Sequence, residues 1–239
     1  FLPDRYSTEA AVFAVNPVAR IDQAEHLLTA RRPWEAMKVL EQVLEHHPND
    51  LVALNMLDIA QAELGAFASA RETLQRALEV DEGHVATHVN LAAVATRTEH
   101  WEEALVHADA AVERGPHTAR AHRTRGGILI SMGRLDEAVG ALETAVSLDA
   151  RDPSSQMMLA DTLARMGRLG EAMTQLEQTV LVWPDFFDAQ IGLAHISLRA
   201  GRLDRARAAL EAARILRPGD PQVATLAGRV ATLAATQEE

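Results

Sequence analysis

A six-residue pattern recurs along the chain at a fixed distance. Gly-Arg-Leu-Asp-Glu-Ala at 133–138 returns as Gly-Arg-Leu-Gly-Glu-Ala at 167–172 and as Gly-Arg-Leu-Asp-Arg-Ala at 201–206, with weaker copies at 65–70 and 99–104. The alanines that close these copies are each 34 residues apart: Ala70, Ala104, Ala138, Ala172 and Ala206. A constant period of this size is typical of helical repeat arrays, in which each repeat buries its apolar face against its neighbours. The period therefore predicts an all-α solenoid.

The period divides most of the chain into six helix pairs. We expect these repeats at 17–50, 51–84, 85–118, 119–152, 153–186 and 187–220. In the fourth repeat, the pattern predicts a first helix near 119–132 and a second near 136–148, and Gly133 supplies the left-handed residue that ends the first. The first repeat reads as one residue short, because we align Trp34-Glu-Ala36 with Trp101-Glu-Glu-Ala104.

The two end segments lie outside the repeats. Residues 1–16 form an N-terminal extension in which 7–15 are predicted to be a short helix. Its apolar side chains favour either packing on the first repeat or the edge of a longer chain. Beyond Pro221, apolar residues recur at helical spacing: Val223, Leu226, Ala227, Val230 and Leu233. We therefore expect 221–239 to provide a C-terminal capping helix and tail that cover the last repeat.

These residues resemble the tetratricopeptide repeat family over about 17–220 and the following helix. Small residues recur in the first helices at Ala92, Gly126, Ala160 and Ala194, and in the second helices at Ala77, Ala111, Ala145 and Ala213. A closing proline recurs at Pro48, Pro116, Pro184 and Pro218. Small residues let paired helices approach closely. The resemblance implies a right-handed superhelical solenoid of about six helix-turn-helix repeats with a C-terminal capping helix.

Several positions depart from the family pattern. Asp58 stands where a small residue is expected and Arg125 where a leucine is expected, while Glu82 and Ala150 replace the closing proline. We expect the two charged side chains to reach the surface. For Arg125, a local distortion or a contact with a partner remains open. Trp34, Phe67 and Trp101 are predicted to be apolar wedges in the core.

Composition narrows the classes of function. The net charge of −11 argues against binding nucleic acid or an anionic membrane surface, and no apolar run is long enough for membrane insertion. Neither a phosphate-binding loop nor a nucleophile motif is present. The ten histidines do not spell out a metal cluster. We expect no enzyme and no cofactor. Lys38 is the only lysine among many arginines and alanines, which favours a bacterial source.

The resemblance also implies where a partner binds. In this family the first helices line a concave groove, and the predicted contact residues here are Asn55, Asn90, Arg97, Arg120, Arg123, Arg165, His195 and Arg199. Arginine pairs with carboxylates and stacks on aromatic rings. Co-chaperones of the family hold a C-terminal carboxylate in a clamp, of which only Asn90 and Arg120 match here. We therefore expect an acidic or extended segment as the ligand.

The function expected is a protein–protein interaction scaffold whose groove binds a peptide or protein segment. Two alternatives remain open: a targeting or regulatory part of a larger enzyme or of a bacterial secretion or assembly component, and a homo-oligomer assembled through the groove. A start at Phe1 favours a truncated chain, whereas the terminal helix favours a finished C-terminal boundary. The absence of cysteine allows both cytoplasm and periplasm, and we expect the cytoplasm.

Overall fold

The computed structural model describes residues 17–235, and every regular element in this range is an α-helix. The first helices of the repeats are α2 (Pro17–Thr29), α4 (Leu51–Glu63), α6 (Val85–Arg97), α8 (Ala119–Ser131), α10 (Pro153–Arg165) and α12 (Phe187–Arg199). The second helices are α3 (Pro33–His46), α5 (Phe67–Val80), α7 (Trp101–Arg114), α9 (Leu135–Leu148), α11 (Leu169–Val182) and α13 (Leu203–Leu216), and α14 (Pro221–Ala235) follows.

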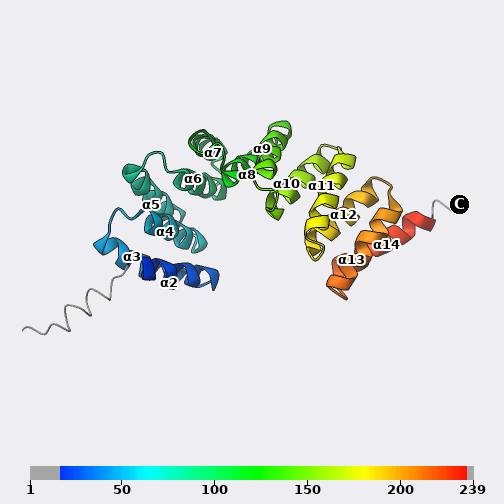
Figure 1. Cartoon of the computed structure of the whole chain (residues 1–239), viewed down its shortest axis with the longest axis horizontal. Helices are drawn as coiled ribbons and strands as arrows, with labels where there is room; N and C mark the ends of the chain where they lie inside the picture. Colours follow the sequence, from blue (N-terminus) through cyan, green and yellow to red (C-terminus); the bar gives the residue numbers. More distant parts are fainter. Residues whose placement is uncertain (1–16, 236–239) are drawn as a thin grey trace, which may run out of the picture. The chain divides into compact units, whose positions relative to one another are not determined.

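These described helices follow one another as packed pairs, with α14 against α13 and α12 (Figure 1). The predicted all-α repeat fold with a terminal helix is therefore confirmed. In α14 the buried side chains are Val223, Leu226 and Val230, at the predicted helical spacing. The helix expected at 7–15 lies outside the described residues.

The first repeat has the same length as the others, so the prediction that it is one residue short was wrong. Helix α3 begins at Pro33, 34 residues before α5 begins at Phe67. Pro33, and not Trp34, is thus the equivalent of Trp101. The Trp34 side chain is accordingly 54% exposed, with the Lys38 ammonium 4.9 Å from its ring centroid. Trp34 is not a core wedge, whereas Phe67 and Trp101 are half-buried.

The chain forms two compact units, divided between Pro116 and His117. The N-terminal unit contains α2–α7 and the C-terminal unit contains α8–α14. In the C-terminal unit, one apolar cluster runs from Val139 on α9 to Val230 on α14. In the N-terminal unit, a cluster centred on Leu40 and Leu54 is separate from one around Leu74 and Leu91.

Close packing explains the small residues of the pattern. The alanine that closes each six-residue copy is fully buried, as is its equivalent in the first repeat: Ala36, Ala70, Ala104, Ala138, Ala172 and Ala206. At Gly126 the constraint is tighter, because a Cβ atom there would lie 2.7 Å from Leu142 Cγ. Even one added methyl group would therefore force the buried Leu142 side chain, or the two helices, to shift.

The turn between the paired helices needs a left-handed residue. Glycine supplies it at Gly65, Gly133, Gly167 and Gly201, with φ between 70° and 79°. Arg31 and Glu99 adopt the same conformation, with φ of 58° and 60°, although their Cβ atoms disfavour it. Where the motif has Arg and Glu, the arginine before the second helix pairs with the glutamate three residues later: Arg32–Glu35, Arg134–Glu137 and Arg168–Glu171.

The two charged departures from the pattern behave differently from each other. Asp58 is only 3% exposed, so the prediction that it reaches the surface was wrong. Its Oδ1 accepts a hydrogen bond of 3.0 Å from Asn90 Nδ2, which explains how a carboxyl group can remain between helices. Arg125 is half-buried, and its charge contributes to the lowered pKa of Glu137, after the stronger effects of the Arg134 hydrogen bond and charge.

Candidate partner-binding face

Residues 34 apart occupy the same place on successive first helices. In the C-terminal unit, Asp161, His195 and Arg229 form one such column on α10, α12 and α14, and Arg165 and Arg199 form a second column one helical turn further on. All five side chains are exposed. We refer to these five residues as the charged columns. Arg199 Nη2 donates a hydrogen bond of 3.0 Å to the Ala164 carbonyl oxygen, which ties α12 to the end of α10.

His195 lies among positive charges. Partial burial of the ring is the largest cause that lowers its pKa, the charges of Arg229 and Arg199 lower it further, and the charge of Asp161 acts in the opposite direction. Because the ordinary pKa of histidine is about 6.5, the ring is neutral at pH 7. The positive charge at this face therefore comes from the arginines.

None of the three arginines in the charged columns has a carboxylate partner among the described residues. Arg165, Arg199 and Arg229 make no ion pair there, although Arg199 donates to a backbone carbonyl. By contrast, arginines on or directly before the second helices bind nearby carboxylates: Arg134 binds Glu137, Arg168 binds Glu171 and Arg214 binds Glu211. The difference leaves guanidinium groups of the first helices available to a carboxylate of another molecule.

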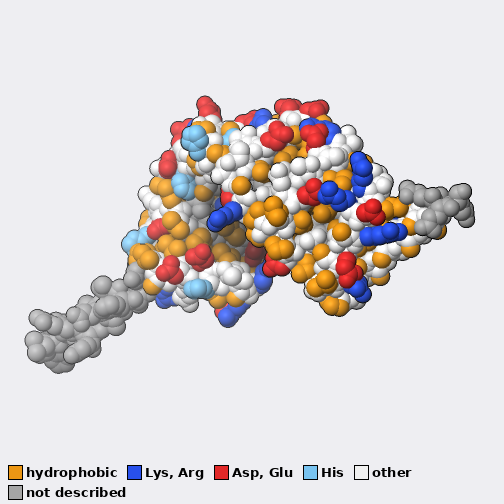
Figure 2. All heavy atoms as spheres, turned by 45° about the vertical axis from the view of Figure 1, so that its right-hand side comes forward, with side chains coloured by type: hydrophobic (Ala, Val, Ile, Leu, Met, Phe, Trp, Pro, Cys, Tyr) orange, Lys and Arg blue, Asp and Glu red, His pale blue; other side chains and the backbone are white. Residues whose placement is uncertain are grey.

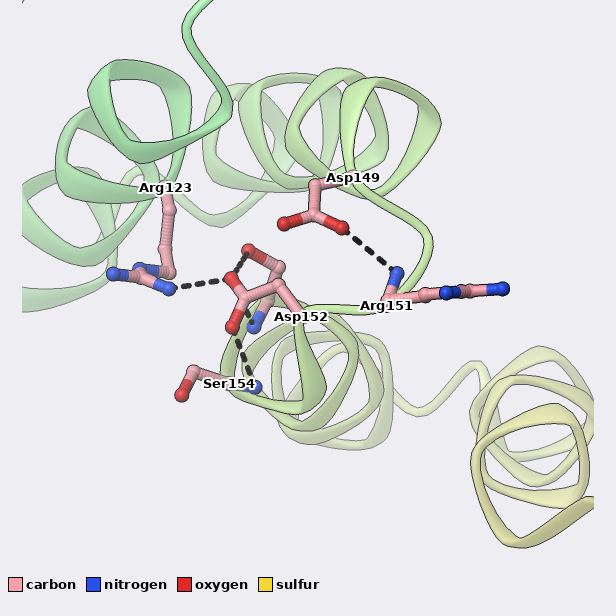
Figure 3. Close-up of polar contacts among 6 residues, drawn as sticks. Arg123, Asp149, Arg151, Asp152 and Ser154 are labelled. Carbon is pink, nitrogen blue, oxygen red and sulfur yellow. Dashed lines mark hydrogen bonds and ion pairs between the residues drawn. The ribbon is translucent and has the colours of Figure 1, made fainter. Parts of the chain in front are cut away.

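Arg123, another predicted contact residue, instead supports a helix end. Its Nη1 lies 2.5 Å from Asp152 Oδ2, and Asp152 also accepts hydrogen bonds from Ser155 Oγ and from the amides of residues 154 and 155 (Figure 3). Burial alone would raise the pKa of Asp152, but the hydrogen bonds from Ser155 and Arg123 outweigh it and lower the pKa. Asp152 is the N-cap of α10, so Arg123 holds this cap in place.

The remaining predicted arginines lie at helix ends. Arg120, the second residue of α8, is exposed. Arg97 ends α6 in the N-terminal unit, where its guanidinium carbon lies 5.3 Å from the ring centroid of Phe67. That geometry fits a cation–π contact, which holds the side chain against the preceding repeat.

The two predicted asparagines are buried between first helices of the N-terminal unit. Asn55 is 8% exposed and Asn90 is 5% exposed. Asn55 Oδ1 accepts a 3.0 Å hydrogen bond from Thr87 Oγ1, and the Asn90 amide donates to Asp58. His84 Nδ1 lies 2.8 Å from Thr87 Oγ1 and extends this buried polar network to the start of α6. These amides are thus already used within the protein, and their contact with a partner stays a prediction.

Histidines are concentrated in the N-terminal unit, which holds seven of the ten: His26, His46, His47, His84, His88, His100 and His107. The visible ones, in pale blue, lie over the N-terminal helices (Figure 2). His84 and His88 do not form a joint site, because His88 Nδ1 faces His107 Nδ1 at 3.3 Å instead. Within residues 17–235, no group of three or more His, Asp or Glu could hold a metal ion.

Between residues 17 and 235, no helix combines the length and the apolar character that crossing a bilayer requires. Two members of the charged columns, Asp161 and Arg229, are not among the contact residues predicted from the sequence, and Arg229 lies on the terminal helix, which was expected only to cover the last repeat. The distance of 34 residues between Arg229 and His195 was the signal that could have identified it. A cap helix extends the spacing of the first helices, so its residues belong to the same columns.

Comparison with known structures places this arrangement among repeat proteins. The type IV pilus biogenesis factor PilW superposes with a TM-score of 0.76 at 17% identity, covering 87% of this chain and 96% of its own. Pseudomonas aeruginosa pilF gives 0.70 at 18% identity, covering 88% and 96%. YrrB, described as a TPR protein with an unusual peptide-binding site, gives 0.61 at 19% identity, covering 78% and 96%.

A search of curated protein sequences found no significant match. Sequence profiles of the tetratricopeptide repeat match residues 27–81, 61–127, 129–182 and 157–221, well over half of the chain. Repeats of this family typically mediate protein binding. The matched residues include all five copies of the recurring six-residue pattern. The chain therefore belongs to the tetratricopeptide repeat family.

Proposed function

We propose that the chain is a non-enzymatic scaffold that binds an extended, acidic segment of a partner protein on the first-helix face of the C-terminal unit. The observation that carries the proposal is the pair of charged columns, in which Arg165 and Arg229 have no carboxylate partner among the described residues. A planar guanidinium binds a carboxylate through two parallel hydrogen bonds. A row of such groups therefore favours a segment with repeated acidic side chains.

Two further observations support this choice. In the N-terminal unit, the positions equivalent to the first column carry Glu25, Ile59 and Ala93. Those equivalent to the second column carry Thr29, Glu63 and Arg97, so that unit has two carboxylates and a single arginine where the C-terminal unit has three arginines and one carboxylate. The peptide-binding protein YrrB has a similar fold, although at 19% identity the likeness concerns the fold alone. The residues proposed for contact are Arg165, His195, Arg199 and Arg229, with Arg120 at the edge of the same unit.

The test uses an acidic probe of simple composition. A fluorescein-labelled dodecapeptide of alternating Glu and Ser, blocked at both ends, is titrated with the protein by fluorescence polarisation. We expect the double change Arg165→Ala and Arg229→Ala to weaken binding at least tenfold, about 1.4 kcal/mol. Binding of the unmodified protein should also weaken as salt rises, because salt screens exposed charges.

The matched control removes the same charge from a second helix. Arg207 and Arg214 are exposed arginines on α13, and changing both to alanine should alter the dissociation constant less than twofold. Helical content and melting temperature should be unchanged in both double variants, since these side chains lie on the surface. Equal weakening in the two double variants would place the binding site elsewhere.

A further inference from the structure

The charged columns border an apolar groove between α12 and α14. The groove has a volume of about 540 Å³, and its walls include Ile191 and Gly192 of α12 and Thr225 and Leu226 of α14. Gly192 contributes only backbone to this wall, because a Cβ atom there would lie 3.5 Å from Met157 Cε and Leu176 Cδ1, toward α10 and α11. The groove thus exposes apolar walls directly beside the charged face.

Charge differs between the two ends of the groove. His195 lines it toward the end of α12, where the charges of Arg229 and Arg199 act on the imidazole ring. Asp188 lines the opposite end, in the first turn of α12. A ligand that places an apolar group beside Ile191 therefore has cations on one side and a carboxylate on the other. Charge complementarity calls for an anionic group on the arginine side only.

The distance from the apolar groove to the arginine side of α12 determines how far apart an apolar and an acidic side chain of the ligand should be. Ile191 and His195 are four residues apart on α12, which corresponds to about 6 Å along the helix axis. In an extended chain, side chains on the same face are two residues apart, or about 6.6 Å. An apolar side chain in the groove and a carboxylate at the arginines thus match positions i and i+2 of an extended segment.

We propose that this groove is a specificity subsite, which takes an apolar side chain from an acidic partner segment when a carboxylate stands two residues away on the same face. The inference rests on the proposed function, because it requires an extended acidic segment on this face. It adds a requirement that charge alone does not impose: the apolar residue must share a face with the acidic residues. Burial of the apolar side chain then supplies affinity that salt does not screen.

The test compares two peptides of identical composition. Both derive from the blocked Glu-Ser dodecapeptide and contain one Leu in place of a central Glu or of the neighbouring Ser, with one Glu changed to Ser in the second peptide so that compositions match. In the first peptide Leu lies on the face of the glutamates, and in the second it lies on the opposite face. We expect the unmodified protein to bind the first at least tenfold more tightly, about 1.4 kcal/mol.

Substitutions in the groove test whether the preference for the first peptide arises there. Ile191→Ser removes one apolar wall and should reduce the ratio of the two affinities to less than twofold. Met158→Ser is the matched control, since Met158 is likewise half-buried, lies on α10 and is not part of the groove. Met158→Ser should leave the ratio of the two peptide affinities unchanged. Thr225→Phe, which narrows the groove from the exposed side of α14, gives a second readout and should also reduce the ratio.

The outcomes separate this inference from the proposed function. If the unmodified protein binds the two peptides equally, while binding still depends on salt and on Arg165 and Arg229, the proposed function stands and the subsite is rejected. A preference that survives both Ile191→Ser and Thr225→Phe also rejects the subsite. If no dodecapeptide binds, both proposals fail.

Discussion

The two units repeat one 34-residue frame, but they fill its first-helix positions in different ways. In the N-terminal unit, Asp58 and Asn90 are buried and hydrogen-bonded to each other. In the C-terminal unit, one apolar cluster runs from α9 to α14, and the charged columns lie outside it. The turn positions differ as well, because Arg31 and Glu99 are left-handed in the N-terminal unit, whereas Gly133, Gly167 and Gly201 serve the C-terminal unit.

This difference teaches that a repeat position does not by itself fix the role of its side chain. A polar group between helices is tolerated only when it is hydrogen-bonded, and it then constrains which partner must lie opposite. The N-terminal unit uses its polar first-helix residues in this way. The C-terminal unit also buries polar first-helix side chains, such as Gln156 and Gln190, but these bond to backbone carbonyls and to Thr179 on α11 rather than to another first helix. Its charged columns stay on the surface.

The largest effect is expected from breaking the buried polar network. Asn90→Leu removes the donor to Asp58 Oδ1 and leaves a buried carboxyl oxygen without this hydrogen bond, which should lower the free energy of unfolding by about 2 kcal/mol. Urea unfolding followed by circular dichroism measures the loss. The matched change is Thr124→Leu, at the equivalent half-buried position of α8, and should shift stability by no more than about 0.5 kcal/mol.

A rescue variant sharpens this comparison. The double change Asp58→Ala and Asn90→Leu replaces both polar partners, and Asp58 becomes the small residue found at Ala92 and Ala160. Because removing both partners costs less than leaving one unpaired, the double variant should be more stable than Asn90→Leu alone. A double variant that is less stable than the single one would contradict the role assigned to this network.

A smaller effect is expected at the turns. Gly133→Ala places a Cβ atom at a φ of 76° and should destabilise the protein by about 1 kcal/mol. Glu99→Gly relieves the same strain in the N-terminal unit and should stabilise it by roughly 0.5 kcal/mol, because glycine also adds freedom to the unfolded chain. Thermal melting of the two variants tests the opposite signs. If both substitutions shifted the melting temperature in the same direction, backbone strain at this turn would not distinguish the two units.

The smallest effect is expected from pH. The pKa of His107 on α7 is lowered by burial, then by the charges of His88 on α6 and Arg71 on α5, while Glu103 on α7 opposes them. The folded state therefore binds this proton more weakly than the unfolded state. The stability that His107 contributes is present above the unfolded pKa of about 6.5 and is lost as pH falls through the lower folded pKa.

Denaturant unfolding at pH 7.5 and pH 5 tests this sign. His107→Gln should lose less stability between the two values than the unmodified protein, because it no longer carries the group that must be protonated. His195→Gln is the comparison in the C-terminal unit. His195 also has a lowered pKa, but its side chain is exposed. His195→Gln should therefore change the stability lost between pH 7.5 and pH 5 less than His107→Gln does.

The sequence by itself determined the repeat architecture. Each helix pair packs mainly within its own repeat and against its neighbours, so the information for the fold lies within about two periods of sequence. The spacing of the closing alanines predicted the paired helices, and the fourth repeat was placed to within a residue or so: 119–132 and 136–148 against Ala119–Ser131 and Leu135–Leu148. Only the register of the first repeat was wrong. Trp34 was aligned with Trp101, whereas the residue equivalent to Trp101 is Pro33.

The tertiary structure alone decided which polar side chains are already bonded within the protein. Arg123 and Arg165 are both first-helix arginines predicted to contact a partner, but Asp152, 29 residues away, binds the first and no carboxylate among the described residues binds the second. Asn90 is likewise occupied by Asp58 on another helix. Periodicity places a residue on a helix face, whereas its hydrogen-bond partner depends on what the adjacent helix presents there. That choice is made by packing between helices and is not encoded in the period.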